Sequence, residues 1–101
     1  MKNYTIRLST EAEEDIDNLY DYIANELMLP FTADKYVGGI FETIEKLSVY
    51  GGSIPINQRQ YLQVNYGPGA RTVTYKKMTI VFNVIRNAIF IRRIMPGSMV
   101  L

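Results

Sequence analysis

The residues best suited to chemistry in this sequence are cationic or aromatic, and they lie in its second half. A guanidinium or ammonium group stabilises negative charge on a phosphate or carboxylate, and a phenol donates or accepts hydrogen bonds. Such residues fit two kinds of site: one that cleaves a phosphodiester bond, and one that binds an anionic surface. The candidates for catalysis are Arg71, Arg92, Arg93 and Tyr75. The candidates for binding a partner are Arg71, Lys76, Lys77, Arg92, Arg93 and Met95.

Cleavage of a phosphodiester bond also requires a proton acceptor, and the sequence has few groups for that role. It contains no histidine and no cysteine, which removes the usual general base and excludes Ser-His and Cys-His hydrolases. Tyr61, Tyr66 and Tyr75 are only remote candidates. We expect neither a cofactor nor a metal site. The residues therefore favour binding over catalysis, while enzymatic activity stays an open alternative.

Charge is divided along the chain. Residues 1–45 contain ten carboxylates and three basic residues, a net charge of −7 (3 − 10), whereas residues 46–101 contain eight basic residues and no acidic one, a net charge of +8. A clustered positive field attracts anionic partners, so we expect the basic half to contact an acidic protein or a nucleic acid. Two simpler interpretations stay open: the halves attract each other within the fold, or the basic residues surround a solvated rim.

The length of 101 residues fits one domain, which we expect to cover residues 1–101. No apolar run approaches the ~20 residues that span a bilayer. Residues 1–9 also lack the apolar core of a signal peptide. We therefore expect a cytoplasmic protein that does not contact a membrane.

The first third of the chain predicts a strand followed by a helix. Apolar and polar residues alternate over residues 3–9, which indicates a strand with one buried face. Ser9 or Thr10 offers an N-cap, and Thr10 with Glu13 has the spacing of a capping box. An apolar stripe then predicts a helix over residues 10–28. We interpret the acidic residues of its first turns as a solvated face that complements the helix dipole.

A second helix follows Pro30, which interrupts the first helical pattern. The next apolar stripe predicts a helix that starts one or two residues later and ends near Tyr50. Gly38 and Gly39 lie in its middle, where each costs about 1 kcal/mol relative to alanine. Close approach of this helix to the first helix or to the sheet would compensate for that cost.

The second half of the chain predicts a β-meander. Residues 53–62 have the pattern of an extended connection, and Gly67-Pro68-Gly69 that of a turn. Strands are predicted at residues 71–75, 78–84 and 88–95, with turns at 76–77 and 85–87. The order β-α-α-β-β-β predicts a two-layer α+β fold, in which a helical hairpin packs on a small antiparallel sheet. We expect the first strand at an antiparallel edge position.

Two adjacent arginines, Arg92 and Arg93, lie within the last predicted strand. Successive side chains of a strand point to opposite faces, so we expect these two to face opposite sides of the sheet. At least one of them would then be available to a partner. The alternative is that both are surface residues at the end of the sheet.

The order of elements and five short stretches resemble the RelE/ParE superfamily of bacterial type II toxins, in its ParE-like or plasmid-stabilisation branch. The stretches are YTIRLSTEAEEDI (residues 4–16), DYIA (21–24), GPGAR (67–71), TIVFNV (79–84) and IFIRRI (89–94). The resemblance covers nearly the whole chain. It implies a toxin neutralised by a cognate antitoxin, whose C-terminal segment wraps the toxin. It is compatible with a homodimer or with a toxin–antitoxin heterotetramer.

The resemblance implies one of two activities, and departures from the family pattern help to separate them. RelE-like members cut mRNA on the ribosome and carry an Arg-x-x-Tyr pattern on the penultimate strand, where this sequence has Thr79 and Phe82. A second arginine follows their last strand, where this sequence has Pro96-Gly97-Ser98-Met99. ParE-like members poison DNA gyrase without being nucleases, and Arg71 matches an arginine that begins their second strand.

These departures favour a gyrase inhibitor that acts by protein binding. A ribosome-dependent mRNA endonuclease is the first alternative, because the second half is basic. A non-toxic remnant that binds only the antitoxin is the second alternative.

Overall fold

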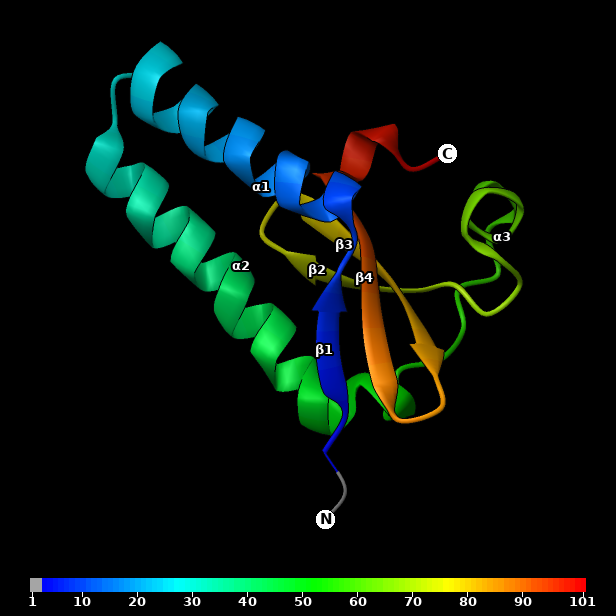
Figure 1. Ribbon diagram of the computed structural model, residues 1–101. Helices are drawn as coiled ribbons and strands as arrows, with labels where there is room; N and C mark the ends of the chain where they lie inside the picture. The colour runs from blue at the N-terminus through cyan, green and yellow to red at the C-terminus, as the bar shows by residue number, and fades with distance from the viewer. Residues whose placement is uncertain (1–2) are drawn as a thin grey trace.

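The computed structural model describes residues 3–101, so the first two residues, including Lys2 counted above, lie outside the description. The elements in chain order are β1 (Thr5–Leu8), α1 (Thr10–Asp21), a π-helical turn (Tyr22–Glu26), α2 (Pro30–Tyr50), α3 (Gln60–Tyr66), β2 (Arg71–Tyr75), β3 (Met78–Ile85) and β4 (Ala88–Pro96). Helices α1 and α2 form a hairpin that packs against one face of the sheet (Figure 1). The predicted α+β fold is thereby confirmed.

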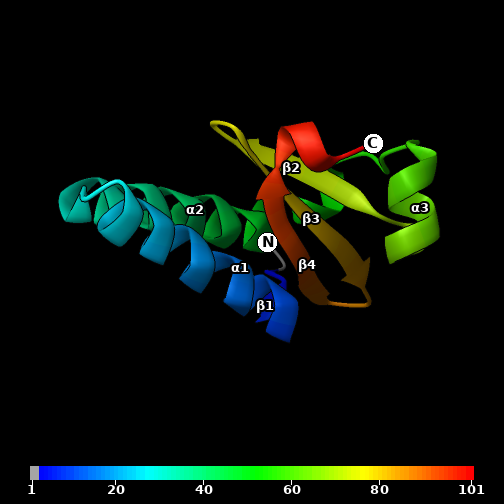
Figure 2. The same cartoon turned by 90° about the horizontal axis from the view of Figure 1, so that it is seen from above.

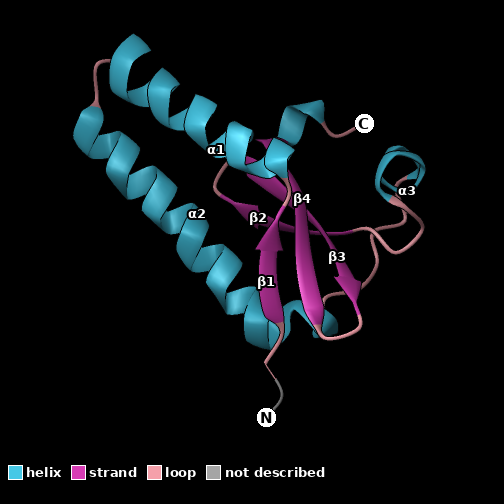
Figure 3. Ribbon diagram, viewed as in Figure 1, coloured by secondary structure: helices cyan, strands magenta, loops and turns pink. Residues whose placement is uncertain are grey.

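The four strands form a mixed sheet in the order β1-β4-β3-β2 (Figure 3). The meander β2-β3-β4 is antiparallel, as predicted, but β1 pairs with β4 in parallel. The edge position predicted for β1 is correct, and its predicted antiparallel direction is wrong. The reason is that α2 brings the chain back to the end of the sheet at which β1 began. Three strands of alternating direction then leave β4 running the same way as β1.

The main core lies between the hairpin and the sheet. The apolar stripes predicted for the two helices face the inward side chains of β3 and β4, and the largest residues there are completely buried. Each such side chain contributes roughly 1.5–3 kcal/mol through removal from water. Prominent members are Ile40, Leu47, Ile80, Phe82, Ile89 and Ile91.

The other face of the sheet, which we call the outer face, is partly covered by α3 (Figure 2). Leu62 of α3 is fully buried against Val81 and Met95 of the sheet. The extended connection predicted for residues 53–62 is therefore wrong from residue 60 onward, where α3 begins. A helix of seven residues spans about two turns, too few to produce a distinct apolar period.

A β-bulge in β4 changes where the adjacent arginines point. Val81 lies opposite Arg93 and Phe82 lies opposite Ile91, so Arg92 has no residue opposite it. The extra residue shifts the alternation, and the inward positions become Ile91 and Ile94. Both arginines therefore belong to the outer face, and the prediction that they face opposite sides is wrong.

The start of α1 differs from the predicted capping box. Ser9 is the N-cap, and its Oγ accepts a hydrogen bond from the Ala12 N–H at 3.0 Å. The predicted pairing of Thr10 with Glu13 is not the cap. The regular α-helix also ends at Asp21, and the π-helical turn carries the chain onward to Glu26.

The two glycines inside α2 have different surroundings. A methyl group at Gly39 would overlap the Tyr75 phenol ring, whereas one at Gly38 would meet open space. The predicted close approach of α2 to the sheet is thus confirmed at Gly39 alone. Tyr75 in turn packs edge-on against Tyr36 of α2, with 5.3 Å between the ring centroids.

The connection between the two long helices contains a strained residue. Met28 has φ of +56°, in the left-handed region that favours glycine. A side chain in that region costs roughly 1–2 kcal/mol, part of which the flexibility of glycine in the unfolded chain would offset. Met28 is 79% exposed, so its replacement removes no core contact.

We predict that Met28→Gly raises the free energy of unfolding by about 1 kcal/mol, or the Tm by about 4–8 °C. Thermal unfolding followed by circular dichroism measures the change. Met28→Ala is the control, because it removes the same side chain and keeps the strained backbone. Equal midpoints for Met28→Gly and Met28→Ala would contradict the prediction.

Candidate functional site

The outer face carries a polar cluster centred on Arg92. One terminal nitrogen of Arg92, Nη1, donates to Asn83 Oδ1 at 2.9 Å, and the guanidinium carbon lies 5.7 Å from the centroid of the Tyr66 ring. Asn83 is 8% exposed, and its Nδ2 donates to the Tyr66 carbonyl at 3.0 Å. A buried amide thus joins the arginine to the last residue of α3. The local result is an orientated cation beside an aromatic face.

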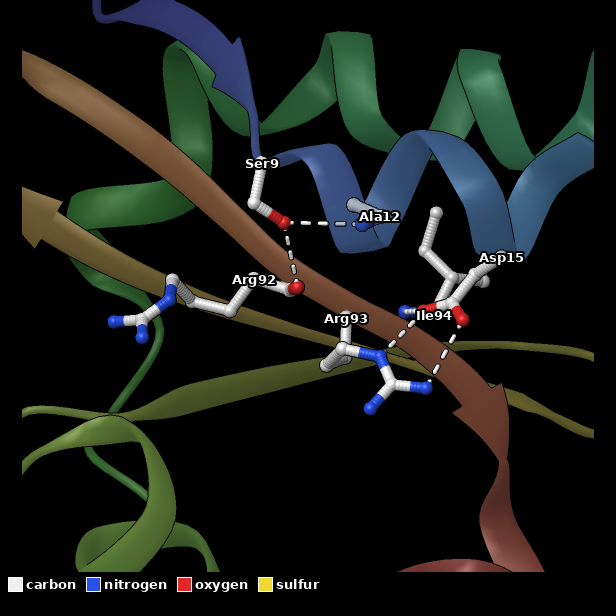
Figure 4. A network of polar contacts seen from close by, with 6 residues as sticks. All are labelled: Ser9, Ala12, Asp15, Arg92, Arg93 and Ile94. Atoms are coloured by element: carbon white, nitrogen blue, oxygen red, sulfur yellow. Dashed lines mark hydrogen bonds and ion pairs between the residues drawn. The ribbon is translucent and has the colours of Figure 1, made fainter.

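Arg93 is held from a different element, the helix α1. Its Nε donates to Asp15 Oδ2 at 2.7 Å and its Nη2 to Asp15 Oδ1 at 3.0 Å, which is a two-pronged ion pair (Figure 4). The Asp15 side chain is 14% exposed and that of Arg93 is 34% exposed. Hydrogen bonding to Asp15 raises the pKa of Arg93 above its ordinary value, so the group stays a cation. The carboxylate neutralises much of its field.

Asp15 also binds the backbone of β4 beyond the point where the pairing of β1 with β4 ends. Its Oδ2 accepts a hydrogen bond from the backbone N–H of Ile94 at 2.9 Å, and at the N-cap of α1 Ser9 Oγ donates to the Arg92 carbonyl at 2.7 Å. Side chains at the start of α1 thus replace the missing strand ladder. Interpreting the whole acidic run as a solvated face is therefore wrong for Asp15, which is a structural anchor.

Two tyrosines of α3 border the cluster. The rings of Tyr61 and Tyr66 meet edge to face, with 6.5 Å between their centroids. Burial raises the pKa of the Tyr66 phenol, and the neighbouring Tyr61 adds to the rise. Tyr66 is therefore protonated near neutral pH and is able to donate a hydrogen bond. It is a poor proton acceptor for chemistry.

The remaining candidates lie apart from the two outer-face arginines. Arg71 turns toward the end of α2, where its Nη1 donates to three backbone carbonyl oxygens at 3.0–3.2 Å. Lys76 lies in the β2–β3 turn, with its Nζ 5.5 Å from the ring of Tyr36 and 5.6 Å from that of Tyr75. Tyr75 packs against α2, and so it cannot assist Arg92. Lys77 shares the turn with Lys76.

Met95 and Arg93 lie beside a groove between α1 and the end of β4. Met95 is only 3% exposed, and it forms part of the lining of the groove. The groove has a volume of about 370 Å³ and an apolar lining in which three methionines take part. Flexible thioether side chains adapt to varied apolar surfaces, so this groove suits an inserted side chain of a partner. The lining residues that extend it are Leu19, Tyr22, Met78, Pro96 and Met99.

Sequence reasoning missed Asp15 and Asn83, the two residues that position the arginines. Asn83 is a single amide inside an apolar strand, and this pattern break is the signal that could have found it. Asp15 is hidden among other acidic residues, and nothing in its spacing distinguishes it. Across residues 3–101 no three potential metal ligands come together, and none of the helices is long and apolar enough to cross a bilayer.

The fold, a helical hairpin on a four-stranded mixed sheet, matches those of solved chains from toxin–antitoxin systems. The chain belongs to the family of ParE toxins of the type II parDE toxin–antitoxin system, whose sequence model matches residues 6–101. The resemblance inferred from the sequence is thereby confirmed.

Solved structures agree with this family. The chain is similar to a chain of the chromosomal ParDE toxin–antitoxin system from P. aeruginosa, with 25% identity, a TM-score of 0.77, and coverage of 92% of this chain and 95% of that one. It shares its fold with a chain of the RelBE2 toxin–antitoxin complex from Mycobacterium tuberculosis, with 16% identity, a TM-score of 0.66, and coverage of 95% and 93%. A comparison with curated protein sequences gave no significant match.

Proposed function

We propose that this ParE-family toxin inhibits DNA gyrase by binding it, and that it does not cleave RNA. The observation that carries the proposal is the state of the outer-face cations. Asn83 holds the guanidinium of Arg92 by a hydrogen bond, and Asp15 neutralises the charge of Arg93 by an ion pair. Neither guanidinium therefore lies over a reactive group. The phenol beside them, Tyr66, has a raised pKa and is unsuited to accept a proton. The site has the residues of a binding surface and lacks an evident general base in the described part of the chain.

The same proposal includes neutralisation by a cognate antitoxin in the cytoplasm. The similar solved chains come from a ParDE system and a RelBE2 toxin–antitoxin complex. An acidic, partly apolar segment fits this chain in two ways: carboxylates reach Arg92 on the outer face, and an apolar side chain enters the groove beside Arg93. Binding of the antitoxin to this region would then exclude gyrase from it.

We predict that the purified chain stops supercoiling by DNA gyrase, and that Arg92→Ala weakens this inhibition at least tenfold. The expected cause is loss of an orientated cation at the centre of a contact surface. The concentration for half inhibition measures the effect. Lys46→Ala on α2 removes a cation elsewhere and serves as the control. Unaffected supercoiling at large molar excess of the wild-type chain would refute the proposal.

An mRNA endonuclease is the second candidate, favoured by one observation. Arg92, Tyr61 and Tyr66 combine a cation with aromatic rings, which suits a stacked base and its phosphate. Primer extension on translated messages distinguishes the two candidates, because only an endonuclease creates new 5′ ends. Normal growth after induced expression without an antitoxin would instead indicate a non-toxic remnant.

A further inference from the structure

The connection between α1 and α2 exposes a group of large apolar side chains. We call this group the hairpin tip, and it consists of Leu27, Met28, Leu29 and Phe31. Met28 is 79% and Phe31 is 86% exposed, and neither belongs to the hydrophobic core. Figures 1 and 2 show the tip projecting beyond the sheet, at the end of the hairpin far from α3. A contiguous apolar projection of this kind marks an interaction site.

The tip keeps apolar residues at two positions where the backbone favours others. Met28 adopts a positive φ, at which glycine is normal. Leu29 is the N-cap of α2 and makes no side-chain hydrogen bond to the helix, at a position that favours serine, threonine, aspartate or asparagine. Both choices weaken the hairpin, and both side chains are about half exposed or more. Residues that oppose the local backbone preference are typical of functional positions, so these two exposed side chains are candidates for a contact outside the chain.

The charges around the tip indicate what it contacts. Asp21, Glu26 and Asp34 are exposed beside it with Lys35, a net charge of −2 (1 − 3). The whole of residues 10–50 has a net charge of −8, from two basic and ten acidic residues (2 − 10). This charge disfavours a second copy meeting the first tip to tip, and it disfavours an anionic lipid surface. A protein groove with an apolar floor and a basic rim is complementary.

We propose that the hairpin tip docks into such a groove on the protein that the toxin poisons, and that this contact is separate from the outer face. The proposal extends the proposed function, since it rests on the toxin having a protein target. Apolar anchors inside a charged rim form the contacts that dominate binding energy in many interfaces. The tip and the outer face would then each contribute to target binding, while the antitoxin needs only the outer face and the groove.

The test is a triple variant, Met28→Gly, Leu29→Ser and Phe31→Gln. The first two changes supply the residues that the backbone favours, so the variant is expected to unfold at a temperature no lower than that of the wild type. Growth arrest on induced expression and inhibition of gyrase supercoiling are both measured. We expect at least a tenfold loss of each. Tyr50→Gln, an exposed apolar residue at the other end of α2, is the control and should change neither.

Several outcomes would overturn the proposal. A triple variant as potent as the wild type would do so. So would a sedimentation change from dimer to monomer, or a loss of binding to anionic vesicles, because each assigns the tip another occupant. Reduced binding to the cognate antitoxin with unchanged toxicity would also count against it. If the wild type arrests growth without inhibiting gyrase, the proposed function fails, and growth arrest alone decides the role of the tip. If the wild type arrests no growth, both proposals fail.

Discussion

Replacement of Asp15 by alanine is expected to lower the free energy of unfolding by about 3 kcal/mol. The carboxylate accepts three hydrogen bonds, two from Arg93 and one from the Ile94 N–H. It is also largely buried, so its loss leaves a partly buried cation and a strand-edge donor without partners. Because α1 and β4 meet here, the variant should also loosen the contact between the hairpin and the sheet. Urea unfolding monitored by tyrosine fluorescence measures the change.

A double-mutant cycle with Arg93→Ala divides the loss of unfolding free energy into the part due to the Asp15–Arg93 ion pair and the part due to the Ile94 N–H. In the Arg93→Ala background, Asp15→Ala should still cost about 1 kcal/mol, because the Ile94 N–H loses its acceptor. Asp15→Asn is the matched single variant, since it keeps an oxygen for that N–H and removes the charge. A cost below 0.5 kcal/mol for Asp15→Ala, roughly that of an ordinary surface substitution, would show that the pair is not an anchor.

Replacement of Arg71 by alanine is expected to lower the free energy of unfolding by a similar amount, about 3 kcal/mol. Its Nη1 lies 3.2, 3.0 and 3.0 Å from the carbonyl oxygens of Gly51, Gly52 and Ile54, respectively. These carbonyls lie where α2 ends, so the guanidinium both caps the helix and ties it to the first residue of β2. The resemblance to ParE-like toxins implies a binding role for Arg71. These three hydrogen bonds indicate instead that Arg71 stabilises the fold.

The two roles of Arg71 are separated by comparing stability with activity. Arg71→Lys keeps a cation near the carbonyls and should recover part of the lost stability. At a temperature where all variants are folded, Arg71→Ala should inhibit supercoiling as strongly as the wild type. An unchanged denaturation midpoint together with lost inhibition would reverse this assignment and make Arg71 a contact residue.

The elements with a clear period were predictable from the sequence, and the missed features depend on contacts between distant residues. The two long helices and the β-meander follow from periods of 3.6 and 2 that span many residues. The direction of β1 depends on the path of the whole hairpin, which no local pattern encodes. The seven residues of α3 are stabilised mainly by Leu62 packing on the sheet, so local propensity could not reveal them.

The candidate site likewise has features that the sequence predicts and features that depend on contacts between distant residues. The type and rough location of the cations were readable, because charge composition needs no structure. Their grouping was not readable, since a single bulge residue in β4 moved Arg92 and Arg93 to the same face. Arg71, equally basic, lies on the other side of the sheet among backbone carbonyls. The sequence therefore identified candidate cations, and only the three-dimensional contacts separate the arginine proposed to bind a partner, Arg92, from those that stabilise the fold.

The central position of β4 determines when the protein can acquire its shape during synthesis. β4 lies between β1 and β3, yet it is the last of these four strands in chain order, and the Ser9–Arg92 hydrogen bond joins residues 83 positions apart. Until β4 emerges, β1 has no neighbour and the hairpin has only part of its sheet to cover. Long-range pairing of this kind slows folding, because loop closure precedes the stabilising contacts. Nascent chains are therefore expected to lack the toxin fold, and a cell gains a delay between translation and toxicity.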